Sequence, residues 1–127
     1  QSNDNPVYYI QHAHARISSV LVKCGADRAL LQDAKLDVLT NEREAQLLQT
    51  LLDYPEVVAN AALDYAPHAV AYYLKDLAGH LHSYYNAEQF LVDDDALKMA
   101  RLALIAAVQQ VLRNGLVLLG VSAPERM

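Results

Sequence analysis

A long, almost uninterrupted apolar segment near the end of the chain limits most strongly what this sequence can fold into. Between residues 95 and 119 apolar side chains recur three or four positions apart, and every residue from 102 to 108 is apolar. This spacing is typical of an α-helix, and a helix that is apolar on several faces lies inside a core. Residues 93–95 are aspartates that can cap its start, and Gly120 follows as a stop signal. We therefore expect a long C-terminal helix with the rest of the chain packed around it.

The same segment is not expected to cross a membrane. Gln109, Gln110, Arg113 and Asn114 interrupt it, so the roughly twenty clean apolar residues that a spanning helix needs never accumulate. The segment is predicted to be the buried core helix of a soluble protein.

Four further helical elements are predicted upstream. The first runs from Asn5-Pro6 to Gly25, and residues 26–40 form a connector with short helical turns. A second helix is capped at residue 41 and buries a stripe of Ala45, Leu48, Leu51 and Leu52. Pro55 is predicted to open a third helix that ends near Asp64, and Pro67 a fourth whose stripe is Val70, Leu74, Leu77, Leu81 and Tyr84. Without a strand pattern, the sequence predicts an all-α bundle of about five helices around the long C-terminal one.

Length and charge narrow the class of protein. The 127 residues suit one domain, and a net charge of −5 gives no overall attraction to nucleic acid, so any RNA site must be local. The single Cys24 excludes an internal disulfide and fits a reducing compartment. Because no basic-then-apolar leader precedes Pro6, we expect no export signal. We expect residues 1–4 to be a protease-cleavage remnant and linker, residues 5–127 to be the domain, and the protein to be cytoplasmic.

Motifs for catalysis or metal binding are lacking. His12 and His14 are two positions apart, as are His80 and His82, so on a helix each pair points in nearly opposite directions and cannot share an ion. No nucleophile elbow, P-loop or dinucleotide fingerprint is present. His14 falls on the apolar stripe and is expected to be buried and hydrogen-bonded to backbone or a carboxylate. We predict no catalytic site, cofactor or metal in this chain, which makes a metal- or ligand-binding bundle the least favoured alternative.

Tyrosines are unusually frequent, at eight in a chain with no Trp and one Phe. Beside the buried stripe of the first predicted helix lies a second row, formed by Tyr9, His12, Arg16, Ser19 and Lys23. Rings and a guanidinium plane at this spacing can support unstacked RNA bases, while Arg and Lys also reach phosphates. The alternative is a solvated face with Tyr at a helix–helix seam, and spacing alone favours that alternative.

Four segments carry a resemblance to a known family. They are residues 5–16 (NPVYYIQHAHAR), 82–86 (HSYYN), 95–98 (DALK) and 119–127 (LGVSAPERM). Together they resemble the C-terminal DALR anticodon-binding domain of bacterial arginyl-tRNA synthetases, with Lys98 where the DALR signature has Arg. The resemblance covers essentially the whole chain beyond Asp4.

The resemblance implies an all-helical domain of class Ia synthetases that binds the anticodon stem-loop of arginine tRNA. By motif position the RNA contacts are Tyr9, His12, Arg16, Tyr85 and Met127, with His12 standing where relatives commonly carry Tyr. It further implies a class I parent enzyme, expected as a monomer, in which an upstream catalytic domain of the same polypeptide uses ATP and Mg²⁺. A rival hypothesis is a helical protein–protein interaction bundle that docks through its Tyr-rich seams and has no RNA role.

Overall fold

The computed structural model describes residues 5–88, 90, 92–125 and 127. Within them the chain forms five α-helices, one 3₁₀ turn and no strand, which confirms the all-α prediction. The elements, in chain order, are α1 (Pro6–Lys23), α2 (Arg28–Leu31), η1 (Leu36–Val38), α3 (Glu42–Leu63), α4 (Pro67–Ala87) and α5 (Asp95–Leu118). The predicted cleavage remnant at residues 1–4 lies outside the described residues.

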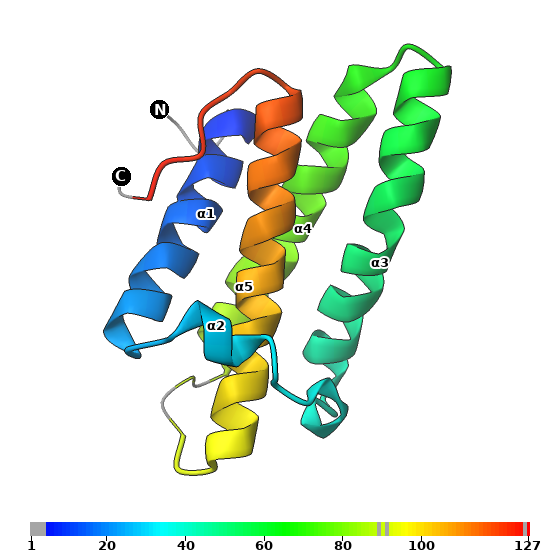
Figure 1. Cartoon of the computed structure of the whole chain (residues 1–127). Helices are drawn as coiled ribbons and strands as arrows, with labels where there is room; N and C mark the ends of the chain where they lie inside the picture. The colour runs from blue at the N-terminus through cyan, green and yellow to red at the C-terminus, as the bar shows by residue number, and fades with distance from the viewer. Residues whose placement is uncertain (1–4, 89, 91, 126) are drawn as a thin grey trace.

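Helix α5 is the centre of the bundle, as the sequence predicts. It contacts α1, α2, η1, α3 and α4, and Figure 1 shows it between α1 on one side and the α3–α4 pair on the other. By length and composition it is the one described helix that could also span a membrane, with 44% of its most apolar stretch buried inside the fold. Even Gln109, which interrupts the apolar run, is buried, and its amide donates to the His14 carbonyl oxygen at 3.1 Å. The other helices thus account for the apolar character of α5.

The helix starts follow the predicted capping signals. The side chains of Asn5 and Asp94 accept hydrogen bonds from the first free amides of α1 and α5. Asn41 and Glu44 form the reciprocal capping box of α3. Each of these residues satisfies backbone donors that a helix start leaves unpaired, so local sequence fixes where the helices begin.

Three helices end with the same turn. After α1, α3 and α5 the chain enters the left-handed region at Gly25 (φ +63°), Tyr65 (φ +51°) and Gly120 (φ +77°). At each end two backbone amides bond back to the last helical turn, as in a Schellman motif. Glycine adopts this conformation at no steric cost, whereas Tyr65 does not.

The predicted break at Pro55 is wrong, because α3 runs unbroken from Glu42 to Leu63 with Pro55 inside it. Proline cannot donate to the Leu51 carbonyl, which normally ends or kinks a helix. Here α4 supports α3 on the N-terminal side of that gap. The Tyr73 hydroxyl of α4 donates to the Thr50 carbonyl, and its ring lies 5.6 Å from the Tyr54 ring. Tertiary contacts therefore override a local signal.

The buried stripe of α3 also differs from the predicted one. Leu47 is fully buried, Leu48 and Leu51 are half-buried, and Ala45 and Leu52 are exposed. The stripe of α4, by contrast, is buried at all five predicted positions. The difference arises because α3 lies at the edge of the bundle, where only one narrow face meets other helices.

A buried polar cluster joins three helices below the apolar core. The Glu44 carboxylate of α3 accepts from the Tyr84 hydroxyl of α4 at 2.7 Å and from Arg101 Nε of α5 at 2.9 Å. Arg101 also lies 3.3 Å from the Glu88 carboxylate. Because burial and the Glu44 carboxylate both disfavour a phenolate, the pKa of Tyr84 is raised. A buried carboxylate with these partners is satisfied.

Candidate nucleic-acid interface

Helix α1 turns its apolar side inward and leaves the row of ring and basic residues at the surface. Ile10, His14 and Ile17 are buried against the core. In the row, Tyr9 and Arg16 are half-buried, whereas His12, Ser19 and Lys23 are exposed. The arrangement leaves an accessible strip of rings and cations on an otherwise acidic molecule.

Four of the five predicted contact residues meet at one open hollow of about 240 Å³. We call it the Arg16 hollow. His12, Ala15, Arg16 and Ser19 of α1 line one side, Tyr85 of α4 lines another, and Met127 closes it from the chain end. The first helix, the fourth helix and the terminus are far apart in sequence, so only the fold brings these residues together.

The Arg16 guanidinium is held at two points in this hollow. Its Cζ lies 4.3 Å from the centre of the Tyr85 ring, within the range of a cation–π contact. Its Nη1 lies 3.0 Å from Nδ1 of His82, also on α4. Burial, the Arg16 charge and nearby His12 together lower the pKa of His82 to about 4. His82 is therefore neutral near pH 7, and its Nδ1 accepts a hydrogen bond from Arg16.

Met127 reaches the hollow because the tail after α5 turns back along α1 (Figure 1). The Gln11 side-chain amide donates to the Ser122 carbonyl at 2.9 Å. His14 Nδ1 lies 2.7 Å from the Pro124 carbonyl, to which it donates. Burial lowers the pKa of His14, although the Pro124 carbonyl opposes that shift. This confirms His14 as a buried imidazole bonded to backbone, and it assigns the bond to the tail.

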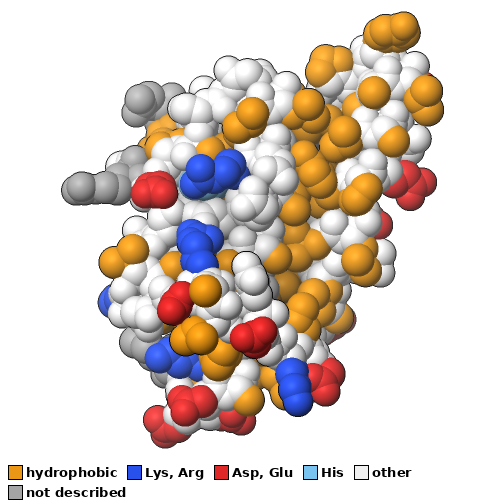
Figure 2. All heavy atoms as spheres, viewed as in Figure 1, with side chains coloured by type: hydrophobic (Ala, Val, Ile, Leu, Met, Phe, Trp, Pro, Cys, Tyr) orange, Lys and Arg blue, Asp and Glu red, His pale blue; other side chains and the backbone are white. Residues whose placement is uncertain are grey.

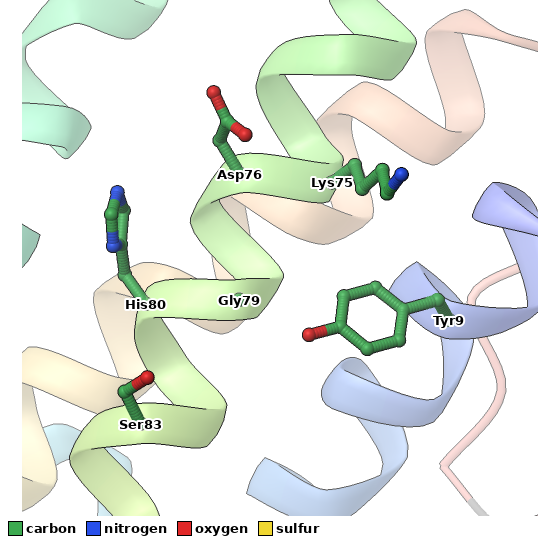
Figure 3. Close-up of a pocket in the computed structure, with 6 residues that line it drawn as sticks. All are labelled: Tyr9, Lys75, Asp76, Gly79, His80 and Ser83. Carbon is green, nitrogen blue, oxygen red and sulfur yellow. The ribbon is translucent and has the colours of Figure 1, made fainter. Parts of the chain in front are cut away.

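Tyr9 is the one predicted contact residue that the structure places elsewhere. Its ring crosses from α1 to α4, where its centre lies 5.0 Å from the His82 ring. It lines a second hollow with α4, formed with Lys75, Asp76, Gly79, His80 and Ser83 (Figure 3). The His12 ring lies 6.0 Å from that of His82, so a group of rings separates the two hollows.

His82 is the residue that the sequence analysis did not identify as part of this site. A usable signal exists, because His82 stands three positions before Tyr85 and so shares its face of α4. Of the two histidine pairs, His12 and His14 differ in burial as expected for opposite faces of α1, with His14 buried and His12 exposed. Nowhere in the described part of the chain do three His, Cys, Asp or Glu side chains gather in a way that could hold a metal ion.

Comparison with known proteins identifies the family. The model of the DALR anticodon binding domain matches residues 10–127. Arginine–tRNA ligases from Azoarcus sp. (strain BH72) and Aromatoleum aromaticum are 64% and 60% identical over the whole chain, which covers 22% of each of them. The solved arginyl-tRNA synthetase of Thermus thermophilus superposes with a TM-score of 0.86 at 36% identity, over 99% of this chain and 22% of that one. The chain thus spans about a fifth of these relatives, and it belongs to the family of DALR anticodon binding domains.

Proposed function

We propose that this chain binds the anticodon stem-loop of an arginine tRNA through the Arg16 hollow. The observation that carries the proposal is the Arg16 guanidinium, fixed over Tyr85 at an open hollow beside His12 and Met127. Proteins recognise single-stranded RNA loops by stacking splayed bases on aromatic rings and guanidinium planes. Family membership and the names of the relatives support RNA as the partner.

The hollow is suited to reading a few bases rather than a long backbone. Arg16 offers a planar stacking surface and further N–H donors, and Met127 adds an exposed, adaptable apolar contact. His12 can also stack, with less ring area than a tyrosine offers. The net charge of −5 gives the chain no overall attraction to RNA, so we assign contacts to most phosphates to the rest of the enzyme.

We assign the chemistry of the parent enzyme to an upstream catalytic domain of the same polypeptide. That domain would activate arginine with ATP and Mg²⁺ and transfer it to the tRNA, as a class I arginine–tRNA ligase. We assign the Mg²⁺ site to that upstream domain as well. We place this enzyme in the cytoplasm as a monomer.

The described surface also has an apolar groove where α3, α4 and α5 meet. Figure 2 shows apolar side chains gathered along the seam between α3 and α5 and toward the α3–α4 turn. The groove there is lined by the ends of α3 and α5 and the start of α4, with residues Val58, Ala61, Ala62, Tyr65, Pro67, Val70, Leu118 and Leu119. This groove is the one observation that favours the rival hypothesis of a protein-interaction bundle. The family match and the relatives support the RNA role, and they offer no support for a bundle without one.

Titration of the chain with an RNA hairpin carrying the anticodon stem-loop of an arginine tRNA tests the proposal. Arg16→Ala and Tyr85→Ala should each weaken binding by about 1–3 kcal/mol, the usual cost of a lost stacking contact. Arg43→Ala, at an exposed position on α3, is the matched control and should bind like the parent. Unchanged affinity in both site variants would contradict the proposal, and a stable protein complex indifferent to the hairpin would favour the rival.

A further inference from the structure

We propose that the second hollow, over Gly79 of α4, is a binding site for another nucleotide of the same RNA. In this site the nucleotide ring lies against Tyr9 and its phosphate lies at Lys75. The inference rests on the proposed function and extends it, because the hollow is separate from the Arg16 hollow.

The argument begins with two glycines inside helices. Glycine is disfavoured in a helix interior relative to alanine, so its presence calls for a reason. At Gly115 of α5 the reason is packing, because an added Cβ would lie 2.5 Å from Cδ1 of the fully buried Leu74. At Gly79 the nearest atom to an added Cβ is the Tyr9 hydroxyl oxygen, at 3.6 Å, which is an ordinary contact. Packing within the chain therefore explains Gly115 and does not explain Gly79.

Gly79 forms the floor of an open hollow of about 470 Å³. Figure 3 shows Tyr9 extending from α1 with its hydroxyl toward Gly79, and Lys75 extending on the same side of α4. Asp76 and His80 stand on the other side, with Ser83 one turn below the glycine. Because Gly79 has no side chain, a ligand in this hollow can approach the α4 backbone closely, which is a recurrent use of glycine in binding sites.

The chemistry of the walls fits a nucleotide better than a simple anion. Tyr9 offers a ring for stacking, and the exposed Lys75 offers an ammonium group for a phosphate. Asp76 would repel a bare phosphate ion, but its carboxylate can accept a hydrogen bond from an exocyclic amine of a base. A ligand with both a phosphate and a base uses all three side chains.

The two hollows also lie at a suitable separation along one strand of RNA. Tyr9 and Arg16 are seven residues apart on α1, which is about 10 Å along the helix axis. Between them the rings of Tyr9, His82 and His12 lie in sequence, with centres 5.0 and 6.0 Å apart. Neighbouring unpaired nucleotides can therefore occupy both hollows and contact a continuous surface of rings.

The test uses the same hairpin titration with Gly79→Ala and Lys75→Gln. Gly79→Ala fills the floor with one methyl group and should weaken binding about five- to tenfold, while the melting temperature stays equal or rises. Lys75→Gln should weaken binding severalfold and reduce the slope of log affinity against log salt by about 0.7, as expected for one lost phosphate contact on a single strand. Lys35→Gln, exposed on the connector before η1, should leave both the affinity and the salt slope unchanged.

Arg16→Ala, measured in parallel, separates the failure of this inference from the failure of the proposed function. If Arg16→Ala weakens binding while Gly79→Ala and Lys75→Gln bind like the parent, the second site is overturned and the proposed function stands. If Gly79→Ala lowers the melting temperature, the glycine is structural and the inference is overturned. If the hairpin does not bind the parent chain, both proposals are overturned.

Discussion

Arg16 shows how single residues prepare this surface before RNA arrives. A free arginine side chain loses rotamer freedom when it binds, at a cost of about 0.5–1.5 kcal/mol. The Tyr85 ring at 4.3 Å and the His82 Nδ1 at 3.0 Å already restrict the Arg16 guanidinium. His82 can do so only while it is neutral, because a protonated imidazole has no acceptor and carries the same charge as Arg16.

Replacement of His82 tests this role. Asparagine places an oxygen acceptor near the position of Nδ1, whereas leucine removes the acceptor at similar volume. His82→Leu should weaken hairpin binding by about 0.5–1.5 kcal/mol because Arg16 becomes mobile. His82→Asn should bind the hairpin nearly as tightly as the parent. In an Arg16→Ala background both substitutions should have no further effect on affinity. Equal losses with and without Arg16 would mean that His82 acts through packing instead.

Tyr65 is a second residue whose local conformation makes a prediction. It has φ +51° at the end of α3 and is 93% exposed, so its ring gains little in return for the strain. Tyr65→Gly should raise the free energy of unfolding by about 0.5–1 kcal/mol, measured by urea denaturation. Tyr65→Ala keeps the Cβ and is the control, which should gain much less. Equal gains would attribute the effect to loss of the exposed ring.

At the scale of elements, the helix starts could be predicted and the behaviour of α3 could not. Asn5, Asn41 and Asp94 act on amides two or three residues away, so short sequence patterns contain the whole interaction. Pro55 is different, because the contacts between Tyr73 and the Thr50–Tyr54 turn come from another helix. No pattern within residues 41–64 contains that information, and so the local signal predicted a break that the bundle does not have.

Two prolines on neighbouring helices provide a matched test of this explanation. Pro55 lies inside α3, whereas Pro67 occupies the first turn of α4, where a missing N–H costs nothing. Pro55→Ala should restore a backbone bond and stabilise the chain by about 1–3 kcal/mol in urea denaturation. Pro67→Ala should change stability by no more than about 0.5 kcal/mol. Destabilisation by Pro55→Ala would show that α3 depends on the proline geometry.

The polar cluster beneath the core holds three elements in register. Tyr84→Phe removes the hydroxyl that donates to the buried Glu44 carboxylate and should cost about 1–3 kcal/mol, because a buried charged acceptor loses one of its donors and no water replaces it. Tyr72→Phe on the same helix is the control, since Tyr72 is 65% exposed, and should be nearly neutral. A near-neutral Tyr84→Phe would mean that Arg101 and the Asn41 amide are sufficient partners for the Glu44 carboxylate.

At the scale of the whole molecule, the sequence predicts the bundle and most of the residues that line the Arg16 hollow. It does not predict which candidate RNA contacts lie at the Arg16 hollow and which lie at the hollow over Gly79. Periodicity identifies which face of α1 and α4 is buried, since burial follows the apolar stripe. It cannot specify that the tail folds back through His14 and Pro124, or that Tyr9 faces a different hollow from Arg16. Those outcomes depend on contacts between residues about 70 to 110 positions apart, which only the assembled fold determines.

The buried positions of His14 and His82 make the stability of the whole molecule depend on pH. The fold lowers the pKa of His14 by burial and that of His82 to about 4, against 6.5 for an unperturbed histidine. Between these values the unfolded chain binds more protons than the folded one, so protons favour unfolding. The stabilisation is complete above about pH 6.5 and is lost progressively as the pH falls toward 4. The fold should therefore weaken on acidification, whereas the bond from His14 Nδ1–H to the Pro124 carbonyl is kept, because a protonated imidazole still donates it.

Urea denaturation at about pH 7.5 and about pH 5 measures this loss of stability. The variant His82→Asn isolates the part of the loss that His82 causes. His82→Asn cannot titrate in this range, so its free energy of unfolding should fall less between the two pH values than that of the parent. His68→Asn changes an exposed histidine on α4 and should keep the pH dependence of the parent. Carboxylates titrate in all three proteins alike, so their contribution cancels in the comparison. If the parent and His82→Asn lose the same stability, His82 is protonated as easily in the fold as in the unfolded chain. It could not then serve as a neutral acceptor for Arg16 at mildly acidic pH.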